Sequence, residues 1–148
     1  MALVELSFSP LPAHVRTARL IATAVARRGG VEESVLDEVR LAVGEACSRA
    51  VEAHRAHCPD EPVRMDLRDA HDRFEVVVTD AVPDGENSPA PALRDLAMSR
   101  SPGAPHGQPD PTSTDLGLAV ITGLADDVEV CPTPSGVQIR MSWPAKAS

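Results

Sequence analysis

The chain has 148 residues, the length of one domain with a hydrophobic core of its own. Hydrophobic residues make up 43% of it but aromatic residues only 2%, so alanine, valine and leucine must fill the core, which favours helices packed on a sheet. The 14 basic and 22 acidic side chains give a formal net charge of −8. This charge argues against direct binding to DNA or RNA, because phosphate backbones bind to a concentrated cationic surface.

The three cysteines also restrict the class of protein. Cys47, Cys58 and Cys131 are odd in number and lack the spacing of a disulfide framework, which indicates a reducing environment. The first residues, MALVELSFSP, have neither the basic region nor the long apolar run of a secretion signal. No stretch approaches the roughly 20 apolar residues of a membrane span. We therefore expect a cytoplasmic protein that does not contact a membrane.

The N-terminal half predicts one strand and two helices. The strand is expected over 3–8, and a helix over 13–28 is ended by Gly29–Gly30. A second helix is expected over about 32–57, with Ser34 or the preceding glycine as its start signal. The apolar residues expected to face the core are Val15, Ala18, Leu20, Ala22, Val25 and Ala26 in the first helix, and Leu36, Val39, Val43, Ala46, Cys47, Ala50 and His54 in the second. The opposite stripe of the second helix contains Glu38, Ala42, Glu45, Arg49 and Glu52.

The C-terminal half predicts four strands and one helix. Residues 63–70 alternate between apolar and polar, as in a half-buried strand, and 74–80 form a β-branched strand that ends in a carboxylate. A helix over 113–126 begins with Ser113 or Thr114 as its cap, and a hairpin follows. The hairpin strands are 127–133 and 136–143, and the apolar face of the helix is expected to consist of Leu116, Ala119, Val120 and Leu124.

Residues 81–112 differ in character, because they hold seven of the fourteen prolines. Only 92–100 within them could form a turn or two of helix. A loop of this length is typical of a lid, a binding loop or a disordered segment. The remaining elements, in the order β-α-α-β-β-loop-α-β-β, predict one α/β (α+β) domain over 1–148. It would be a two-layer sandwich with its helices on one face of a mixed or antiparallel sheet.

Three segments carry a resemblance to a known family: LDEVRLAVGEACSRAVEAH, FEVVVTD and LGLAVITGLADDVEV. Over about 8–143 the chain resembles the bacterial anti-sigma factor and serine-protein kinase family. The resemblance implies the GHKL, or Bergerat-like, fold of the ATPase domains of histidine kinases, gyrase and Hsp90-type chaperones. It also implies ATP or ADP as cofactor, a sigma factor and an anti-anti-sigma protein as partners, and a homodimer.

The resemblance assigns roles to individual positions. In the family, a helix carries E-x-x-x-N, whose Glu polarises the attacking hydroxyl and whose Asn holds magnesium. A strand ends in D-x-G-x-G, whose Asp meets the adenine amino group, and a later helix begins G-x-G-L beside the phosphates. By this resemblance Glu45 takes the catalytic position and Asp80 the adenine-reading position. Gly117 takes the second glycine of the last motif, and Gly85 is a phosphate-loop glycine displaced by one residue.

Other positions depart from the family pattern. Arg49 stands in place of the Asn, Val82 and Asp84 replace the glycines after the strand, and Asp115 replaces the first glycine of the last motif. Arginine has five donors and no acceptor, so it cannot be a magnesium ligand. A carboxylate at a helix N-terminus repels a phosphate there. The ATP site is therefore expected to be degenerate, with no metal-binding residue assigned and no use of magnesium in the usual way.

Glu45 and Arg49 allow three interpretations. Four residues apart on a helix, they would form a surface ion pair worth about 0.3–0.5 kcal/mol. Arg49 could instead contact phosphates in place of the metal, or either residue could contact a protein partner. The ion pair is the favoured interpretation.

His54, His57 and Cys58 have spacings that could share a metal ion. A helix end whose His and Arg side chains complement the helix dipole is the favoured alternative.

Two functions follow from the resemblance and its departures. The first is an anti-sigma regulatory factor that binds a sigma factor, an anti-anti-sigma protein or both, with ATP use impaired or absent. The second is an ATP-dependent serine protein kinase that phosphorylates the antagonist, with Glu45 as its catalytic residue, Asp80 on adenine and Arg49 in place of magnesium. The loss of the metal ligand and of the paired glycines favours the first.

Overall fold

The computed structural model describes residues 2–70, 72–82 and 113–146. Its helices and strands follow the order expected from the sequence, with ends that differ by one or two residues. They are β1 (Ala2–Phe8), α1 (Pro12–Arg28), α2 (Glu33–His57), β2 (Val63–Ala70), β3 (Arg73–Asp80), α4 (Ser113–Leu124), β4 (Asp127–Thr133) and β5 (Gly136–Pro144). The helical segment considered within 92–100 lies outside the described residues.

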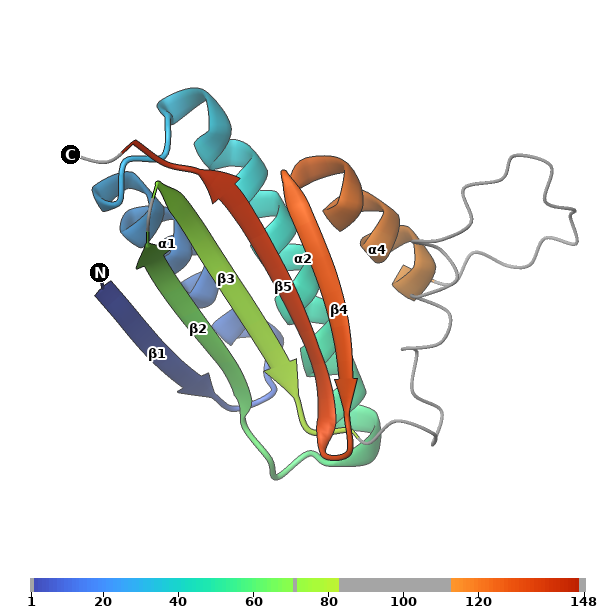
Figure 1. Cartoon of the computed structure of the whole chain (residues 1–148). Coiled ribbons are helices and arrows are strands. Elements are labelled where there is room, and N and C mark those ends of the chain that lie inside the picture. Colours follow the sequence, from blue (N-terminus) through green and yellow to red (C-terminus); the bar gives the residue numbers. More distant parts are fainter. Residues whose placement is uncertain (1, 71, 83–112, 147–148) are drawn as a thin grey trace, which may run out of the picture.

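The five strands form one sheet in the order β1-β2-β3-β5-β4, and each strand runs antiparallel to its neighbours. Short turns join β2 to β3 and β4 to β5, and strands joined in this way pair antiparallel. The helices cover one face of the sheet (Figure 1). The predicted two-layer α+β sandwich is therefore confirmed, and its described sheet is antiparallel rather than mixed. No helix in the described ranges is both long enough and apolar enough to cross a bilayer.

The alternation of β3 builds the core and also places its last residue. Phe74, Val76 and Val78 point to the helices, and Asp80 is the fourth member of the same buried row. Trp143 of β5 stacks on Phe74 with ring centroids 6.2 Å apart. Its Nε1 donates a hydrogen bond of 3.1 Å to the carbonyl of Leu124, which ties the end of α4 to the sheet.

α2 is the central helix, lying between α1 and α4 (Figure 1). Every residue predicted for its core face is buried. Ala42 and Arg49, expected on the opposite stripe, are buried as well, at 0% and 7% exposed. α4 packs against α2, whose other flank contacts α1 at Gly44, so the flank with Ala42 and Arg49 is covered. Arg49 is therefore not on the surface, where the ion-pair interpretation placed it.

Three other local predictions were wrong. The N-cap of α2 is Glu32 and not Ser34, although the helix starts where it was expected, and Leu20 of α1 is 62% exposed. In α4, Ile121 is buried whereas Ala119 and Val120 are exposed. The buried side of α4 is set by its packing against neighbouring elements. The periodicity of the α4 sequence alone does not predict which side that is.

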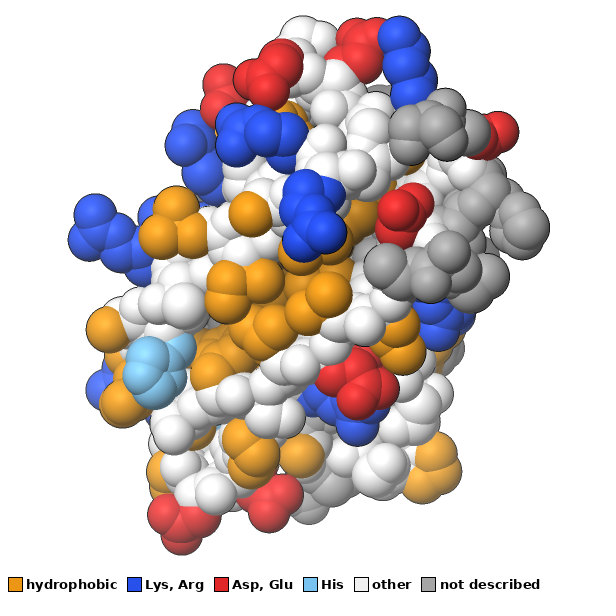
Figure 2. Space-filling view, turned by 90° about the vertical axis from the view of Figure 1, so that its left-hand side faces the viewer, with side chains coloured by type: hydrophobic (Ala, Val, Ile, Leu, Met, Phe, Trp, Pro, Cys, Tyr) orange, Lys and Arg blue, Asp and Glu red, His pale blue; other side chains and the backbone are white. Residues whose placement is uncertain are grey.

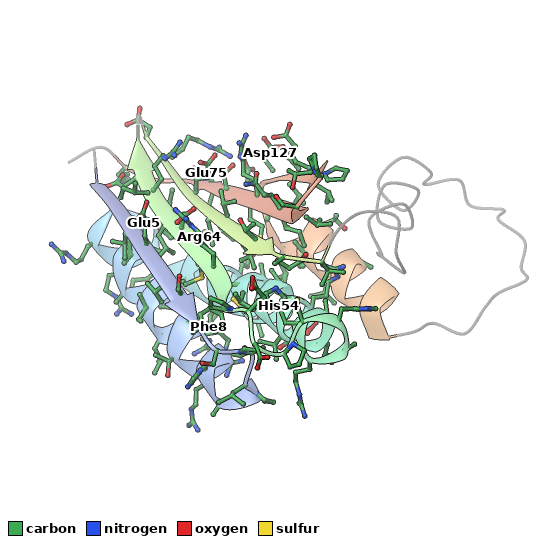
Figure 3. The ribbon with its side chains drawn as sticks, turned by 90° about the horizontal axis from the view of Figure 1, so that it is seen from below. Glu5, Phe8, His54, Arg64, Glu75 and Asp127 are labelled. Carbon is green, nitrogen blue, oxygen red and sulfur yellow. The ribbon has the colours of Figure 1, made fainter. Side chains whose placement is uncertain are left out.

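The outer face of the sheet carries ion pairs between strands. Arg64 of β2 reaches Glu5 of β1 at 3.2 Å, and Arg140 of β5 lies 3.5 Å from Glu75 of β3 and 3.0 Å from Glu129 of β4. Figure 3 shows Glu5, Arg64 and Glu75 on the side turned away from the helices. Exposed pairs of this kind add little stability. They keep this face polar, so the apolar surface of the molecule lies elsewhere.

The β1 edge carries part of that apolar surface. Leu6 and Phe8 of β1, and Ile21 and Val25 of α1, are only partly buried against the core. Figure 2 shows this edge, with a band of apolar side chains across it. A hollow of about 330 Å³ lies between the strand and the helix.

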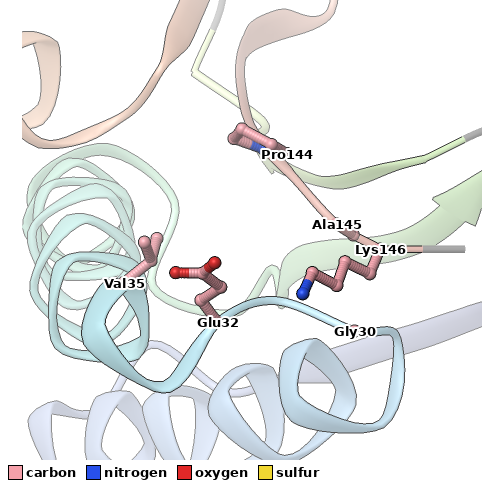
Figure 4. Close-up of a pocket in the computed structure, with 6 residues that line it drawn as sticks. All are labelled: Gly30, Glu32, Val35, Pro144, Ala145 and Lys146. Carbon is pink, nitrogen blue, oxygen red and sulfur yellow. The ribbon is translucent and has the colours of Figure 1, made fainter.

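The turn between α1 and α2 closes against the C-terminal end of β5. Gly30 has φ +98°, a conformation that side-chain-bearing residues rarely adopt, and its carbonyl accepts a 2.9 Å hydrogen bond from the Lys146 amide. A Cβ on Gly30 would collide with the Lys146 carbonyl oxygen. Figure 4 shows a pocket of about 360 Å³ beside this joint, with Glu32 and Lys146 on opposite sides of it.

We expect Gly30→Ala to lower the free energy of unfolding by about 1–3 kcal/mol, because alanine is strained at this φ and has no room. The matched control is Gly123→Ala in α4, where an added Cβ meets no atom within 4 Å. That substitution should stabilise the protein by about 0.5–1 kcal/mol through helix propensity. Urea unfolding of the two variants checks the prediction, and equal effects would contradict it.

Candidate functional site

The site begins at Asp80, where β3 ends beside the start of β5. Asp80 is 5% exposed, and its Oδ1 accepts hydrogen bonds from the amides of Val82 at 2.9 Å and Val137 at 3.3 Å. A Cβ on Gly136 would collide with the carbonyl oxygen of Asp80, so only glycine lets β5 approach this closely. The strand-end carboxylate predicted from FEVVVTD is therefore buried and fixed in orientation by backbone amides.

A buried histidine of α2 holds the residue that follows. His54 is 0% exposed, its Nε2 lies 2.8 Å from the amide nitrogen of Ala81, and its Nδ1 lies 2.8 Å from the carbonyl oxygen of Glu61. An amide only donates and a carbonyl only accepts, so the ring is neutral with its proton on Nδ1. His54 thus joins α2 to the chain entering β2 and to the chain leaving β3. Figure 3 shows it at this end of α2.

The hydrogen bonds of His54 leave neither of its ring nitrogens free to bind a metal ion. Both ring nitrogens are used within the protein, and the described residues contain no group of three or more His, Cys, Asp or Glu side chains that could hold a metal ion. Burial raises the pKa of the nearby Cys58 thiol, and the carboxylates of Glu61 and Asp80 raise it further. A raised pKa lowers the fraction of thiolate, which is the form of cysteine that binds metals and acts as a nucleophile.

α2 also carries the two other candidate residues. Glu45 is half-buried and Arg49, one turn later, is buried. Arg49 precedes His54 by five residues, roughly 7–8 Å along the helix axis. Both lie in the second half of α2, which runs toward the end that holds His54. The fold therefore brings Asp80, His54 and Arg49 to one end of the molecule, with Glu45 a further turn away.

The two glycines assigned by resemblance are less informative. Gly117 lies within α4, in its first half. Gly85 lies outside the described residues, as does Asp84. The phosphate-binding loops implied by the resemblance therefore fall largely on a part of the chain that the structure does not describe.

The residues at this end do not fit a magnesium ion held in the family manner. Mg²⁺ requires oxygen ligands in near-octahedral geometry, and the side chain at position 49 offers only N–H donors. They fit an adenine-like group better, because a buried carboxylate held by backbone amides is a fixed acceptor for an exocyclic amine. Asp80 can therefore bind an uncharged hydrogen-bonding group, and the cation at this end of the molecule is Arg49. Neither feature requires a divalent metal.

Sequence reasoning missed His54 and Gly136 as parts of this site. His54 was placed correctly on the buried face of its helix, but its bonds to Glu61 and Ala81 depend on pairing between distant segments. Gly136 was read only as a turn residue. A histidine among apolar residues on a core face is the one available signal, since a buried imidazole needs hydrogen-bond partners.

We expect His54→Leu to lower the free energy of unfolding by about 2–4 kcal/mol, because it leaves the amide of Ala81 and the carbonyl of Glu61 buried without a partner. It should also speed hydrogen exchange at the Ala81 amide. His57→Leu, three residues later and exposed, is the matched control and should change stability by less than about 0.5 kcal/mol. Urea unfolding and amide exchange check both variants. Unchanged exchange at Ala81 in His54→Leu would refute the role of His54.

Comparisons with known proteins identify the family to which this fold belongs. Residues 8–143 match the histidine kinase-like ATPase domain. The chain is 28% identical over 141 residues to the serine-protein kinase RsbW of Bacillus licheniformis, covering 94% of this chain and 83% of that protein. It is 30% identical over 141 residues to the RsbW of Halalkalibacterium halodurans, covering 94% and 81%.

A solved structure supports the fold. It is the crystal structure of the RsbU and RsbW domains of a Mycobacterium tuberculosis protein, with a TM-score of 0.64 and 14% sequence identity. The match covers 100% of this chain and 34% of that longer chain. The matched family, the relatives and the solved structure all point the same way: the chain belongs to the histidine kinase-like ATPase domain family.

Proposed function

We propose that this chain is an anti-sigma regulatory factor that acts by binding proteins and makes little or no use of magnesium and ATP. Its partners would be a sigma factor, an anti-anti-sigma protein or both. The observation that carries the proposal is Arg49, a buried guanidinium at the position where the resemblance places the metal-binding Asn.

Because Arg49 is buried, a small movement of its side chain would not open this position to a metal ion. A surface arginine could swing aside and leave its place to water and a metal ion. A guanidinium that is 7% exposed is instead part of the packed interior of the fold. Removing a buried charged group from its setting is strongly unfavourable. A guanidinium also offers magnesium no oxygen ligand, so the catalytic role of Glu45 would lack its metal.

Nucleotide binding without phosphoryl transfer is compatible with this proposal. Asp80 keeps the buried strand-end position and the fixed carboxylate that adenine recognition requires. ATP or ADP could be held by Asp80, with Arg49 near the phosphates, and Gly85 and Gly117 in the loops around them. The nucleotide would then stabilise the fold or tune partner binding, with Glu45 inactive.

The kinase alternative rests on the relatives, which are named serine-protein kinases. It requires phosphoryl transfer in which a guanidinium takes over the charge compensation that the metal supplies in the usual reaction. Arginine stabilises charge in such reactions, but it does not bridge phosphate oxygens as a metal ion does. The regulatory proposal needs no such replacement.

The remaining features of the proposal concern assembly and location. We propose a homodimer, for which the apolar band at the β1 edge is a suitable surface, since edge strands readily pair with another chain. The net charge of −8 is compatible with binding basic regions of proteins and not with direct nucleic-acid binding. The proposed location is the cytoplasm. The partner surface would involve α1, the outer side of α2 and residues 81–112.

The test uses the purified chain with the sigma factors and anti-anti-sigma proteins of its source organism. We expect one sigma factor or antagonist to bind in calorimetry with a Kd of about 1 μM or tighter, without ATP and equally well to the Glu45→Ala variant. Incubation with magnesium–ATP should leave the mass of the antagonist unchanged. A gain of one phosphate that disappears with Glu45→Ala would establish the kinase alternative, and no binding to any of these proteins would refute both.

A further inference from the structure

The pocket beside the turn between α1 and α2 has walls of opposite charge. It has a volume of about 360 Å³ and lies between the start of α2 and the C-terminal end of β5. Glu32 lines one side and Lys146 the other, and Figure 4 shows the carboxylate and the ammonium group turned toward the same opening. Val35, Pro144 and Ala145 add an apolar lining. The pocket therefore offers one anion, one cation and an apolar surface.

The two charges are not neutralised by ion pairs within the described residues. Glu32 and Lys146 are too far apart to pair across the pocket, and neither pairs with another side chain in the described ranges. Glu33, the next residue, shows the contrast, because its carboxylate lies 3.0 Å from Nε of Arg27. The carboxylate of Glu32 accepts a long hydrogen bond of 3.4 Å from the hydroxyl of Ser34. Both charges are thus available to a molecule that enters the pocket.

The backbone around the pocket is already fixed. The carbonyl of Gly30 accepts a 2.9 Å hydrogen bond from the amide of Lys146, and the amide of Ala145 donates one of 2.8 Å to the carbonyl of Asp72. Val31, just before Glu32 in the chain, is buried. Ordering on binding would therefore be confined to the two charged side chains. A site that is largely formed in advance loses less affinity to such ordering.

Charge complementarity selects the class of ligand. A simple anion would be attracted by Lys146 and repelled by Glu32, and a simple cation would meet the reverse. An uncharged apolar molecule would take water from both charges without pairing either of them, which is unfavourable. One carboxylate is too few for a metal ion, and no metal-binding group occurs among the described side chains. A zwitterion pairs both charges at once.

We propose that this pocket binds a small zwitterion with an apolar body, of the class of free apolar amino acids. Its ammonium group would lie on Glu32, its carboxylate on Lys146, and its side chain against Val35 and Pro144. Ligand pockets span roughly 300–1,000 Å³, and a volume of about 360 Å³ suits a molecule of this small size.

The proposed pocket goes beyond the proposed function and does not depend on it. It lies at the first turn of α2, whereas His54 lies in the last turn, so the full length of the helix separates it from the end of the molecule with Asp80. A ligand there would join the turn between α1 and α2 to the end of β5. Because it binds the folded chain, it should also raise the thermal unfolding midpoint.

The experiment follows the backbone amide NMR signals of the purified chain during titration with leucine. We expect a Kd of about 0.1–1 mM, with shifts at the amides of Gly30 and Lys146 and weaker binding at high salt. Glu32→Gln and Lys146→Gln should each weaken leucine binding about fivefold, the effect of one exposed ion pair. Glu52→Gln, an exposed residue in the second half of α2, is the matched control and should bind like wild type.

Two leucine derivatives separate the two charges of the ligand. N-acetyl-leucine keeps only the carboxylate, and leucinamide keeps only the ammonium group, so both should bind the wild type more weakly than leucine does. N-acetyl-leucine should bind Glu32→Gln more tightly than the wild type, and leucinamide should bind Lys146→Gln more tightly, because each substitution removes the repelling charge. Unchanged unfolding midpoints without ligand would show that the variants are folded.

Three results would overturn the proposal. One is the absence of shifts at the Gly30 and Lys146 amides at about 10 mM leucine, where a Kd of about 1 mM predicts near-saturation. The second is leucine binding that neither charge variant changes. The third is equal binding of leucine and its two derivatives, which would show that the charges take no part. None of these results bears on the proposed function, which is tested separately with protein partners.

Discussion

One buried imidazole holds together the end of the molecule on which the account depends. His54 accepts a hydrogen bond from Ala81 and donates one to Glu61, so a single side chain of α2 fixes both the entry to β2 and the exit from β3. Asp80 is the residue before Ala81, and its carboxylate is oriented by amides on β5 and on the chain that follows. Without His54, the Ala81 amide and the Glu61 carbonyl would lose the side chain that ties both segments to α2.

The same end of the molecule keeps the fold of the family and one of its site residues, but not the residue that holds the metal. Position 80 keeps a buried acceptor, whereas position 49 holds a cation that excludes a divalent metal. The burial of Arg49 makes it part of the packed interior rather than a surface change. On the outer side of α1 and α2, Arg16, Arg19 and Arg55 line a groove and form no ion pair with a carboxylate of the described residues. Both features fit a protein whose work is done through contacts with other proteins.

Local sequence patterns predicted most of the fold, and the reasons are physical. The alternation in FEVVVTD and the 3.6-residue period of α2 each reflect burial on one face, so the bounds and inward faces of β3 and α2 followed from them. Asp80 could be located because it ends a strand. The burial of Arg49 depends on α4, and the partners of His54 come from two distant segments. The orientation of α4 through Ile121 is set by its neighbours, so none of these could be read from a local pattern.

The central claim is that magnesium has no role at the end of the molecule formed by Asp80, His54 and Arg49. Its most direct test is calorimetric titration of the wild-type chain with ATP, once with magnesium and once with the metal chelated. The account predicts the same result in both titrations, whether that is binding of equal affinity or no detectable heat. ATP binding that appears only with magnesium would contradict it, because a site with a buried guanidinium in place of the metal ligand would then be using the metal after all.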